Sequence, residues 1–325
     1  MSHAVEPTFF MVGAARAGTT SMYDYLRAHP QIFMPPNALG VAGKEPSFFC
    51  DLVPPWATQY RDRDTYLSLF EKGRGRLAVG DGSTNYLVAP ESPRRIREQY
   101  PDAKILMILR NPVARAHSLY RYICGWGFED APTFEKGLAR EASRLGNARF
   151  IREWQLLYHA FLYYHSGLYS EQVARYFDAF PREQVHIVLF DDMKKDLLGT
   201  VQGIYRFLGV DPAFEPELDA RNASSFPLSV KFQAFVGRRW HANPLYPRGP
   251  VRGRDRTHYP IAMSINGLLG GYRKERMRPE TRRELTERFA PDIAKTAALV
   301  GRNLDHWVEE RSAARVKDAK VAVQV

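Results

Sequence analysis

A glycine-rich run near the N-terminus has the residue types and spacing of an anion-binding turn. Residues 9–21, FFMVGAARAGTTS, place four residues between Gly13 and Gly18 and follow them with hydroxyl side chains. Successive N–H groups in such a turn converge on an anion, and the positive end of a following helix adds to the attraction. The usual nucleotide-binding loop carries Lys directly after its second Gly, where this chain has Thr19. Its only cation is Arg16, so the run predicts a phosphate or sulfate site whose charge lies within the turn.

The backbone and hydroxyl groups of this loop supply the first candidate ligands. Glycine lets the backbone approach an anion closely, and Thr19 and Thr20 can each donate a hydroxyl hydrogen bond. The candidate binding residues are Gly13, Ala14, Ala15, Arg16, Ala17, Gly18, Thr19, Thr20 and Ser21.

A second candidate site follows the most apolar run of the chain, KILMIL at residues 104–109. Ligands of doubly wound sheets bind beyond the carboxyl ends of strands, where Arg110 emerges. Ser118 lies two helical turns further along RNPVARAHSLY, so both side chains can face one phosphate. A metal-dependent kinase would have Asp at the end of such a strand. Asp81 and Asp191 follow other strand-like runs, so a metal site is disfavoured without being excluded.

A third candidate is the pair Lys44 and Glu45 in KEPSFF, which can put a carboxylate beside a cation at a pocket wall. Taken alone, the pattern favours a solvated ion pair with Phe48 and Phe49 in the core.

These sites need an alternation of strands and helices to position them. Apolar strands that alternate with amphipathic helices indicate a parallel sheet with helices on both faces. We therefore expect an α/β fold of the P-loop type. The predicted strands are residues 9–12, 77–79, 104–109 and 185–190. The predicted helices are residues 19–29, 90–100, one that begins at Pro112, 150–164, 169–180, 197–208 and 278–299.

We expect one domain over residues 1–310. Within it, residues 222–272 lose regular periodicity and are rich in Arg, Pro and aromatic residues, which predicts an irregular segment that covers the substrate or cofactor. Residues 311–325 are charged and rich in Ala and Val, which predicts a frayed tail.

The composition limits the partners of the chain. Its 325 residues carry a formal net charge of +10, which favours an anionic ligand. No long basic run or nucleic-acid-binding motif accompanies that charge, and no segment has the length and apolarity to span a membrane. The two cysteines, Cys50 and Cys124, form no metal-ligand spacing, and they fit a reducing compartment. We expect a cytoplasmic protein.

Together, GAARAGTTS, KEPSFF and RNPVARAHSLY resemble the sulfotransferases that use 3′-phosphoadenosine 5′-phosphosulfate (PAPS). The likeness is to the branch of the heparan sulfate glucosaminyl sulfotransferases and their bacterial relatives. It covers residues 9–210 and the last helix, including the closing GRNLDHW.

The resemblance implies a role for each motif. The first loop would hold the 5′-phosphosulfate, and Arg110 and Ser118 the 3′-phosphate. Glu45 would be the catalytic base, with Arg16 and Lys44 assisting. The family's late disulfide-bounded basic loop has no cysteines here, and residues 248–256, RGPVRGRDR, could replace it. The candidates in that segment are Arg252 and Arg254.

The implied reaction moves the sulfuryl group of PAPS to a hydroxyl, or less favourably an amine, of a small molecule, glycan or natural product. Adenosine 3′,5′-bisphosphate (PAP) is the other product, and no metal is required. Two alternatives stay open: a P-loop kinase or NTPase with a degenerate loop, and a non-enzymatic nucleotide- or glycan-binding protein. Asp81 and His165 are the alternative bases, and Trp126 and Phe128 are candidates for the acceptor pocket.

Overall fold

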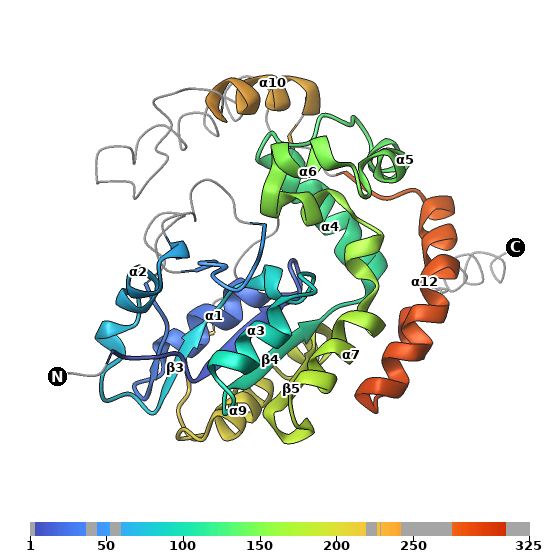
Figure 1. Ribbon diagram of the computed structural model, residues 1–325. Coiled ribbons are helices and arrows are strands. Elements are labelled where there is room, and N and C mark those ends of the chain that lie inside the picture. Colours follow the sequence, from blue (N-terminus) through green and yellow to red (C-terminus); the bar gives the residue numbers. More distant parts are fainter. Residues whose placement is uncertain are drawn as a thin grey trace, which may run out of the picture.

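Five parallel strands form a single sheet in the computed structural model, in the order β2-β3-β1-β4-β5 (Figure 1). The structure describes residues 4–36, 44–52, 60–218, 226–227, 229–241 and 275–309. The strands are β1 (Phe9–Gly13), β2 (Ile32–Phe33), β3 (Ala78–Asp81), β4 (Lys104–Leu109) and β5 (Val185–Leu189). Every residue of β1 is buried, and so is all of β4 after its first residue. The predicted parallel α/β fold is confirmed.

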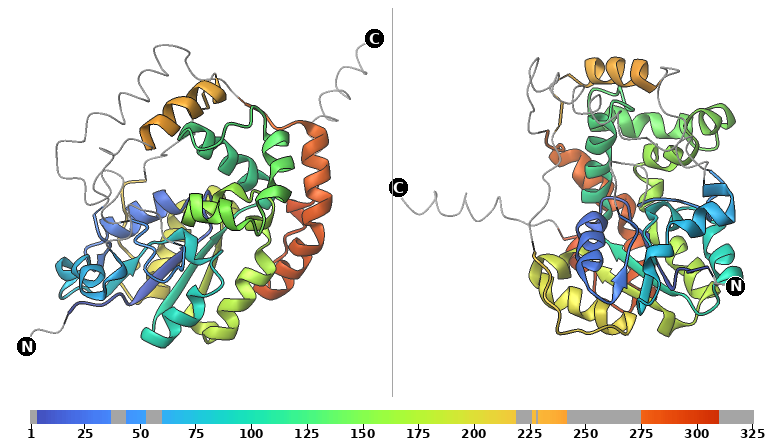
Figure 2. Two further views of the ribbon diagram at one scale, coloured as in Figure 1. Left: turned by 45° about the horizontal axis from the view of Figure 1, so that its top comes forward. Right: turned by 90° about the vertical axis from the view of Figure 1, so that its left-hand side faces the viewer.

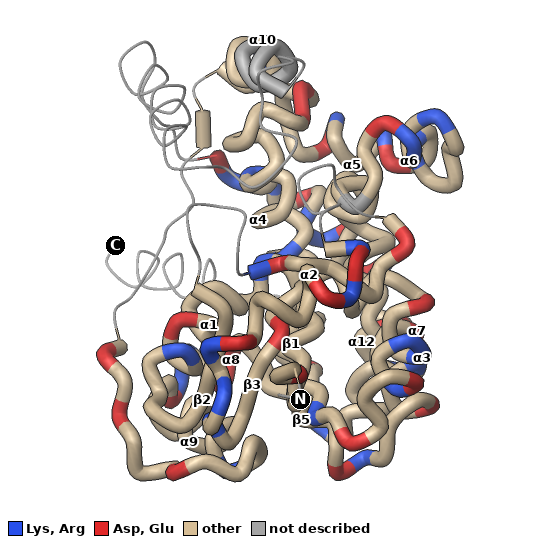
Figure 3. The backbone as a smooth tube through the Cα atoms, turned by 60° about the vertical axis from the view of Figure 1, so that its left-hand side comes forward, with Lys and Arg blue, Asp and Glu red and all other residues tan. Residues whose placement is uncertain are grey.

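Helices cover both faces of the sheet. Figure 3 shows α1 (Thr19–Ala28), α8 (Phe190–Lys195) and α9 (Leu197–Leu208) on one side of the strands. On the other side lie α3 (Ser92–Gln99), α7 (Tyr169–Ala179) and α12 (Pro279–Val300). This arrangement leaves the carboxyl edge of the strands for the connecting loops, where ligands of such sheets bind.

Helix α4 (Pro112–Gly125) begins at that edge and runs away from the sheet. Its N-terminus is fixed by Asn111, whose Oδ1 accepts a hydrogen bond from the amide of Ala114 at 3.0 Å, and by Pro112 in the first turn. Figure 2 shows its far end among α5 (Phe134–Arg144), α6 (Ala148–Trp154) and α10 (Val230–His241). A short helix, α2 (Arg63–Ser68), lies between β2 and β3 in the chain. Across the described ranges, no helix combines the length and apolarity needed to cross a bilayer.

Two segments differ from the sequence prediction. The helix predicted over residues 150–164 ends at Trp154, because Gln155 has a left-handed φ of 49°, and a 3-10 helix (Gln155–Phe161) follows. Part of the segment predicted to be irregular, residues 222–272, is helical as α10. The rest of that segment, apart from residues 226–227 and 229, lies outside the described residues, as does the predicted tail at 311–325.

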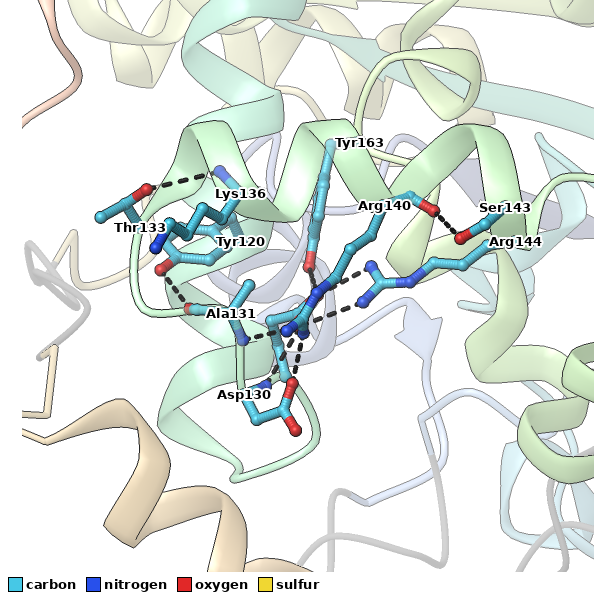
Figure 4. Close-up of polar contacts among 10 residues, drawn as sticks. Tyr120, Asp130, Ala131, Thr133, Lys136, Arg140, Ser143, Arg144 and Tyr163 are labelled. Atoms are coloured by element: carbon cyan, nitrogen blue, oxygen red, sulfur yellow. Dashed lines mark hydrogen bonds and ion pairs between the residues drawn. The ribbon is translucent and has the colours of Figure 1, made fainter.

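A buried carboxylate fastens the end of α4 to α5 and to the segment that follows α6 (Figure 4). Glu129 is 1% exposed, and its Oε2 lies 2.7 Å from Arg144 Nη1 and accepts a 2.7 Å hydrogen bond from the Tyr163 hydroxyl. Arg140 and the amide of Ala131 bind its Oε1 at 3.0 and 2.9 Å. Burial alone would raise the pKa of Glu129, but the hydrogen bonds and the Arg144 charge outweigh it and hold that pKa below its usual value.

We expect Glu129→Gln to lower the free energy of unfolding by roughly 3 kcal/mol at pH 7, because it leaves Arg144 buried without its counter-charge. A carboxylate with a lowered folded-state pKa stabilises the protein above the unfolded pKa, near 4.5, and loses this effect as the pH falls through the folded value. The deficit should therefore narrow in urea titrations below about pH 4.5. Glu171→Gln, at an 82% exposed glutamate paired with Arg175, is the control and should change stability by less than about 1 kcal/mol. A pH-independent deficit for Glu129→Gln would contradict this account.

Candidate active site

The loop between β1 and α1 has the backbone shape that its glycines predict. Gly18 has φ 90°, and a Cβ there would lie 3.0 Å from the Phe190 ring. Arg16 also has a left-handed φ, of 69°, which only a few per cent of non-glycine residues adopt. No side chain caps the N-terminus of α1 at Gly18, so its first amides point out of the helix toward the turn. This is the geometry of a helix N-terminus that can receive an anion.

Two of the predicted loop ligands use their amides within the protein. The N–H of Ala14 donates to the carbonyl of Ile108 at 2.8 Å, and the N–H of Ala17 donates to the carbonyl of Ala14 at 3.1 Å. These bonds tie the loop to β4 and close its turn. Anion binding through the backbone therefore falls to the other residues of the loop.

The structure brings Arg16 together with both residues of the second motif. The Arg16 Nε donates to the Ser118 Oγ at 3.2 Å, and an Nη of Arg110 donates to the Arg16 carbonyl at 2.9 Å. These three residues come from the β1–α1 loop, the end of β4 and α4, which meet at the carboxyl edge of the sheet. Arg110 and Ser118 thus both contact Arg16, while their binding of one phosphate stays a prediction.

The guanidinium groups of Arg16 and Arg110 each lie over an aromatic ring. Arg16 lies 4.6 Å from the centroid of the Tyr122 ring, and Arg110 lies 4.7 Å from that of Phe190. Burial lowers the pKa of both arginines from its usual value. Arginine stays protonated at neutral pH despite this lowering of its pKa. Both side chains therefore carry a poorly hydrated positive charge, which favours the binding of an anion.

Lys44 and Glu45 lie beside the first turn of α1, which directly follows this loop. The Lys44 Nζ donates to the Thr20 Oγ1 at 2.8 Å and lies 3.8 Å from Glu45 Oε1. Lys44 is only 10% exposed, and burial lowers its pKa, while the Glu45 charge opposes this change. The pair is thus attached to the start of α1 and is not the solvated surface pair that its residues alone favoured.

Thr84 holds the Glu45 carboxylate with two hydrogen bonds. Its amide donates to Oε2 at 2.6 Å and its hydroxyl donates to Oε1 at 2.9 Å. Burial raises the pKa of Glu45, and Lys44 and these two hydrogen bonds oppose the rise. The side chain keeps 32% of its surface exposed, so the carboxylate is oriented by the protein and still accessible. Thr84 lies in GDGSTNY, which follows a strand; within this stretch the sequence indicated a possible role for Asp81 but none for Thr84.

Asp81, one of the alternative bases, has a different position. It is fully buried and accepts hydrogen bonds from the hydroxyls of Ser83, Tyr66 and Tyr86 at 2.7, 2.9 and 2.8 Å. Burial raises the pKa of Asp81 to about 6. The Ser83 Oγ also accepts the amide of Ser47 at 3.0 Å, so Asp81 anchors the turn that positions the Glu45 segment.

The other titratable candidates, His165 and Asp191, form hydrogen bonds within the protein. His165 binds Glu141 of α5 through Nδ1 at 2.7 Å. Asp191, the acidic residue after β5, accepts the Trp307 indole N–H at 2.8 Å, and the Trp307 carbonyl accepts from the Asn111 side chain at 3.0 Å. The closing GRNLDHW thus docks against the start of α4, a long-range contact that its sequence did not reveal.

The structure describes the residues predicted for the acceptor pocket but not the two arginines predicted late in the chain. Phe128 lines a cavity beyond the end of α4, and Trp126 stacks beside it at 6.3 Å between ring centroids. Arg252 and Arg254 lie outside the described residues, so their binding role stays a prediction.

The fold and the site define an α/β protein with a phosphate-type loop and a second basic position beside it. Comparison with known proteins places this architecture in a family, since the family model for a sulfotransferase domain matches residues 6–230. The chain belongs to the sulfotransferase family, whose chemistry is the transfer of sulfuryl groups.

Individual relatives agree with that assignment. A crystal structure of a sulfotransferase from Alicyclobacillus acidocaldarius superposes with a TM-score of 0.68 at 32% identity, covering 94% of this chain and 100% of that one. Human heparan sulfate glucosamine 3-O-sulfotransferase 6 is 28% identical over 79% of this chain and 66% of its own length. Human bifunctional heparan sulfate N-deacetylase/N-sulfotransferase 2 is 25% identical over 63% of this chain and 22% of its own length. The chain thus spans less than two thirds of these human relatives.

We expect Thr84→Val to raise the pKa of Glu45 further, because the ionised carboxylate loses its hydroxyl donor while the side-chain volume is kept. Thr84→Ser retains the donor and should restore the native pKa. Carboxyl 13C NMR on glutamate-labelled protein measures both values, with the Glu45 signal assigned from its absence in Glu45→Gln. Equal Glu45 pKa values in Thr84→Val and Thr84→Ser would refute this role of the hydroxyl.

Proposed function

We propose that the protein transfers the sulfuryl group of PAPS to an acceptor hydroxyl, with Glu45 as the general base. One observation carries the proposal: Ser118 and Arg110 contact Arg16 of the loop after β1, and Lys44, which lies beside Glu45, contacts Thr20 at the start of the following helix. A ligand held there would meet a second anion site at one end and the Glu45 carboxylate at the other. PAPS has this distribution of groups, with a 3′-phosphate and a 5′-phosphosulfate.

The donor set fits the compound. When bound, PAPS supplies an activated sulfuryl group, and the bond from its sulfur to the bridging oxygen of the 5′-phosphate is the one that breaks. The uncapped amides of α1, together with the Thr19 and Thr20 hydroxyls, can hold the 5′-phosphate. Arg110 and Ser118 can hold the 3′-phosphate, for which a planar guanidinium is suited.

Glu45 is placed to accept the proton of the attacking hydroxyl. Its raised pKa makes it a stronger base than an ordinary carboxylate, while Thr84 and Lys44 keep the ionised form populated. Negative charge then grows on the departing 5′-phosphate, where Arg16 and the loop amides can stabilise it. Lys44, between Thr20 and Glu45, can contact sulfuryl oxygens during this displacement.

The contacts of this chain favour the proposal over the two alternatives. A kinase of the P-loop class needs an acidic metal ligand after a strand, whereas Asp81 and Asp191 are bound by hydroxyl and indole donors. A non-enzymatic binding protein has no use for a carboxylate held by two hydrogen bonds at the ligand loop. The proposed acceptor is a hydroxyl group of a glycan or of a small molecule. We also propose a cytoplasmic location, because the two cysteines of the chain fit a reducing compartment.

Thermal unfolding with PAP tests the cofactor class. We expect PAP at 100 times its dissociation constant to stabilise the native state by about 2.7 kcal/mol, with or without Mg²⁺. Arg110→Ala should reduce the shift because it removes the 3′-phosphate ligand. ADP with Mg²⁺ is the control ligand. A shift that appears only with ADP and Mg²⁺ would favour the kinase class, and no shift with either would favour the non-enzymatic alternative.

Glu45→Gln separates chemistry from binding. We expect turnover to fall on the order of 100-fold or more, because the amide cannot accept the proton, while the thermal shift with PAP is retained. The assay follows PAP release from PAPS with an acceptor that the native enzyme sulfates, chosen from a panel of phenols and oligosaccharides. Near-native turnover of Glu45→Gln would reject Glu45 as the base.

A further inference from the structure

A cavity of about 730 Å³ lies beyond the far end of α4, between α5 and α6. Its volume falls in the range of sites that bind small molecules. It is lined by residues that the proposed transfer reaction does not use, among them Phe128, Asp130, Arg140, Glu153 and Trp154. The cavity therefore needs its own explanation.

Aromatic rings form one wall of this cavity. The Trp154 ring lies 5.9 Å from Phe128, 4.6 Å from Phe161 and 6.0 Å from Phe150, measured between centroids. Phe128 and Phe161 also line the cavity but are largely buried, at 8% and 1% exposure. Trp154 and Phe150 are partly exposed, so they present ring surface to the cavity. Such rings bind the apolar faces of flat ligands.

The wall of the cavity also carries charged side chains, which are largely paired, and the Arg144 guanidinium lies 5.5 Å from the centroid of the Phe150 ring. The buried Glu129 holds Arg140 and Arg144 in place, and Arg140 also pairs with Asp130 (Figure 4). Among the described lining residues, the three carboxylates of Glu129, Asp130 and Glu153 oppose two guanidinium groups. The wall thus offers many hydrogen-bonding groups without a positive surplus.

A row of rings connects this cavity with the anion-binding loop. Tyr122 stacks under Arg16 at 4.6 Å, Trp126 lies 5.9 Å from Tyr122, and Phe128 lies 6.3 Å from Trp126 with nearly parallel rings. The row follows the last turn of α4 from the loop to the cavity lining. The loop and the cavity are therefore linked by side chains that pack along one stretch of the chain.

We infer that this cavity is an acceptor subsite for an uncharged sugar ring, distinct from the ring or group that receives the sulfuryl group. The inference rests on the proposed function, because it takes the bound molecule to be the acceptor. The exposed rings of Trp154 and Phe150 stack on the sugar face, and Arg140, Asp130 and Glu153 bind its hydroxyls. The acceptor is then an oligosaccharide or glycoside with a neutral unit beyond the sulfated position.

The charge balance of the wall sets the selectivity. A polyanionic glycan would bring carboxylates or sulfates against Glu153 and Asp130, whose charges are not outnumbered by the two arginines. An uncharged ring meets no such repulsion and can use donors and acceptors alike.

Binding of two tetrasaccharides tests the inference without any turnover. Isothermal calorimetry of the native protein with saturating PAP compares chitotetraose, which is neutral, with a heparosan tetrasaccharide, which is polyanionic. We expect chitotetraose to bind more tightly, and Trp154→Ala to weaken it by about tenfold or more. Glu153→Gln, at an exposed position that does not threaten folding, should weaken chitotetraose and narrow the discrimination against heparosan.

Phe177→Ala is the matched control, because it removes a ring on α7 that stacks with Arg182 outside the cavity lining. It should leave both tetrasaccharide affinities unchanged. The inference is wrong if neither sugar binds, if heparosan binds as tightly as chitotetraose, or if Trp154→Ala leaves chitotetraose affinity intact while melting normally. PAP binding is measured separately by thermal shift. If the native protein does not bind PAP but binds chitotetraose in a way that requires Trp154, the transfer function and the acceptor role are both wrong. The cavity would then be a glycan site without a role in transfer.

Discussion

The gathering of three cations around one turn of backbone is the constraint on which the rest of the structure depends. Arg16, Arg110 and Lys44 are withdrawn from water, and Glu45 is the one carboxylate that the described contacts place among them. Removing a cation from water is costly unless other groups replace its hydration. Here the replacement is made by the Tyr122 and Phe190 rings, the Ser118 and Thr20 hydroxyls and the Arg16 carbonyl. These partners are neutral, and the Glu45 carboxylate lies 3.8 Å from Lys44. The start of α1, the start of α4 and residues 44–45 must therefore be in place together.

The Glu45 carboxylate is the second element that this arrangement requires, and it depends on groups that never touch a ligand. Burial raises the pKa of the Glu45 carboxyl, while Lys44 and the two Thr84 hydrogen bonds oppose this rise. The turn that carries Thr84 is held by Asp81, which accepts hydrogen bonds from three hydroxyl groups. Asp81, an alternative base in the sequence analysis, therefore supports the segment of Glu45, the residue we propose as the base. The complete burial of Asp81 and its partners distinguish the two roles, and neither property can be read from a single sequence.

The parts of the protein that could be predicted from the sequence are those that follow local rules. Gly13 and Gly18 define the turn by their spacing, and β4 and α9 appeared at the predicted residues because their apolar patterns are unambiguous. Arg110 could be placed at the sheet edge because carboxyl ends of parallel strands share one edge. Thr84 on Glu45, Tyr122 under Arg16 and Trp307 on Asp191 could not be found in this way, since each pairs residues far apart in the chain. The helix expected over residues 150–164 ends early for a related reason: its aromatic residues form long-range packing contacts, and Gln155 adopts a left-handed φ that ends the helix.

The two ends of α4 differ in net charge. This difference could separate the proposed binding places of the sulfuryl donor and the acceptor. At its start, Arg16 and Arg110 create a surplus of positive charge that would attract any polyanion, whether donor or acceptor. Beyond its end, the Glu129 cluster neutralises Arg140 and Arg144, so the cavity offers no comparable attraction. Under the proposed function, an uncharged acceptor unit in the cavity is not drawn toward the cationic loop, where the nucleotide is proposed to bind. The ring row from Tyr122 to Phe128 follows the last turn of α4 between these two places.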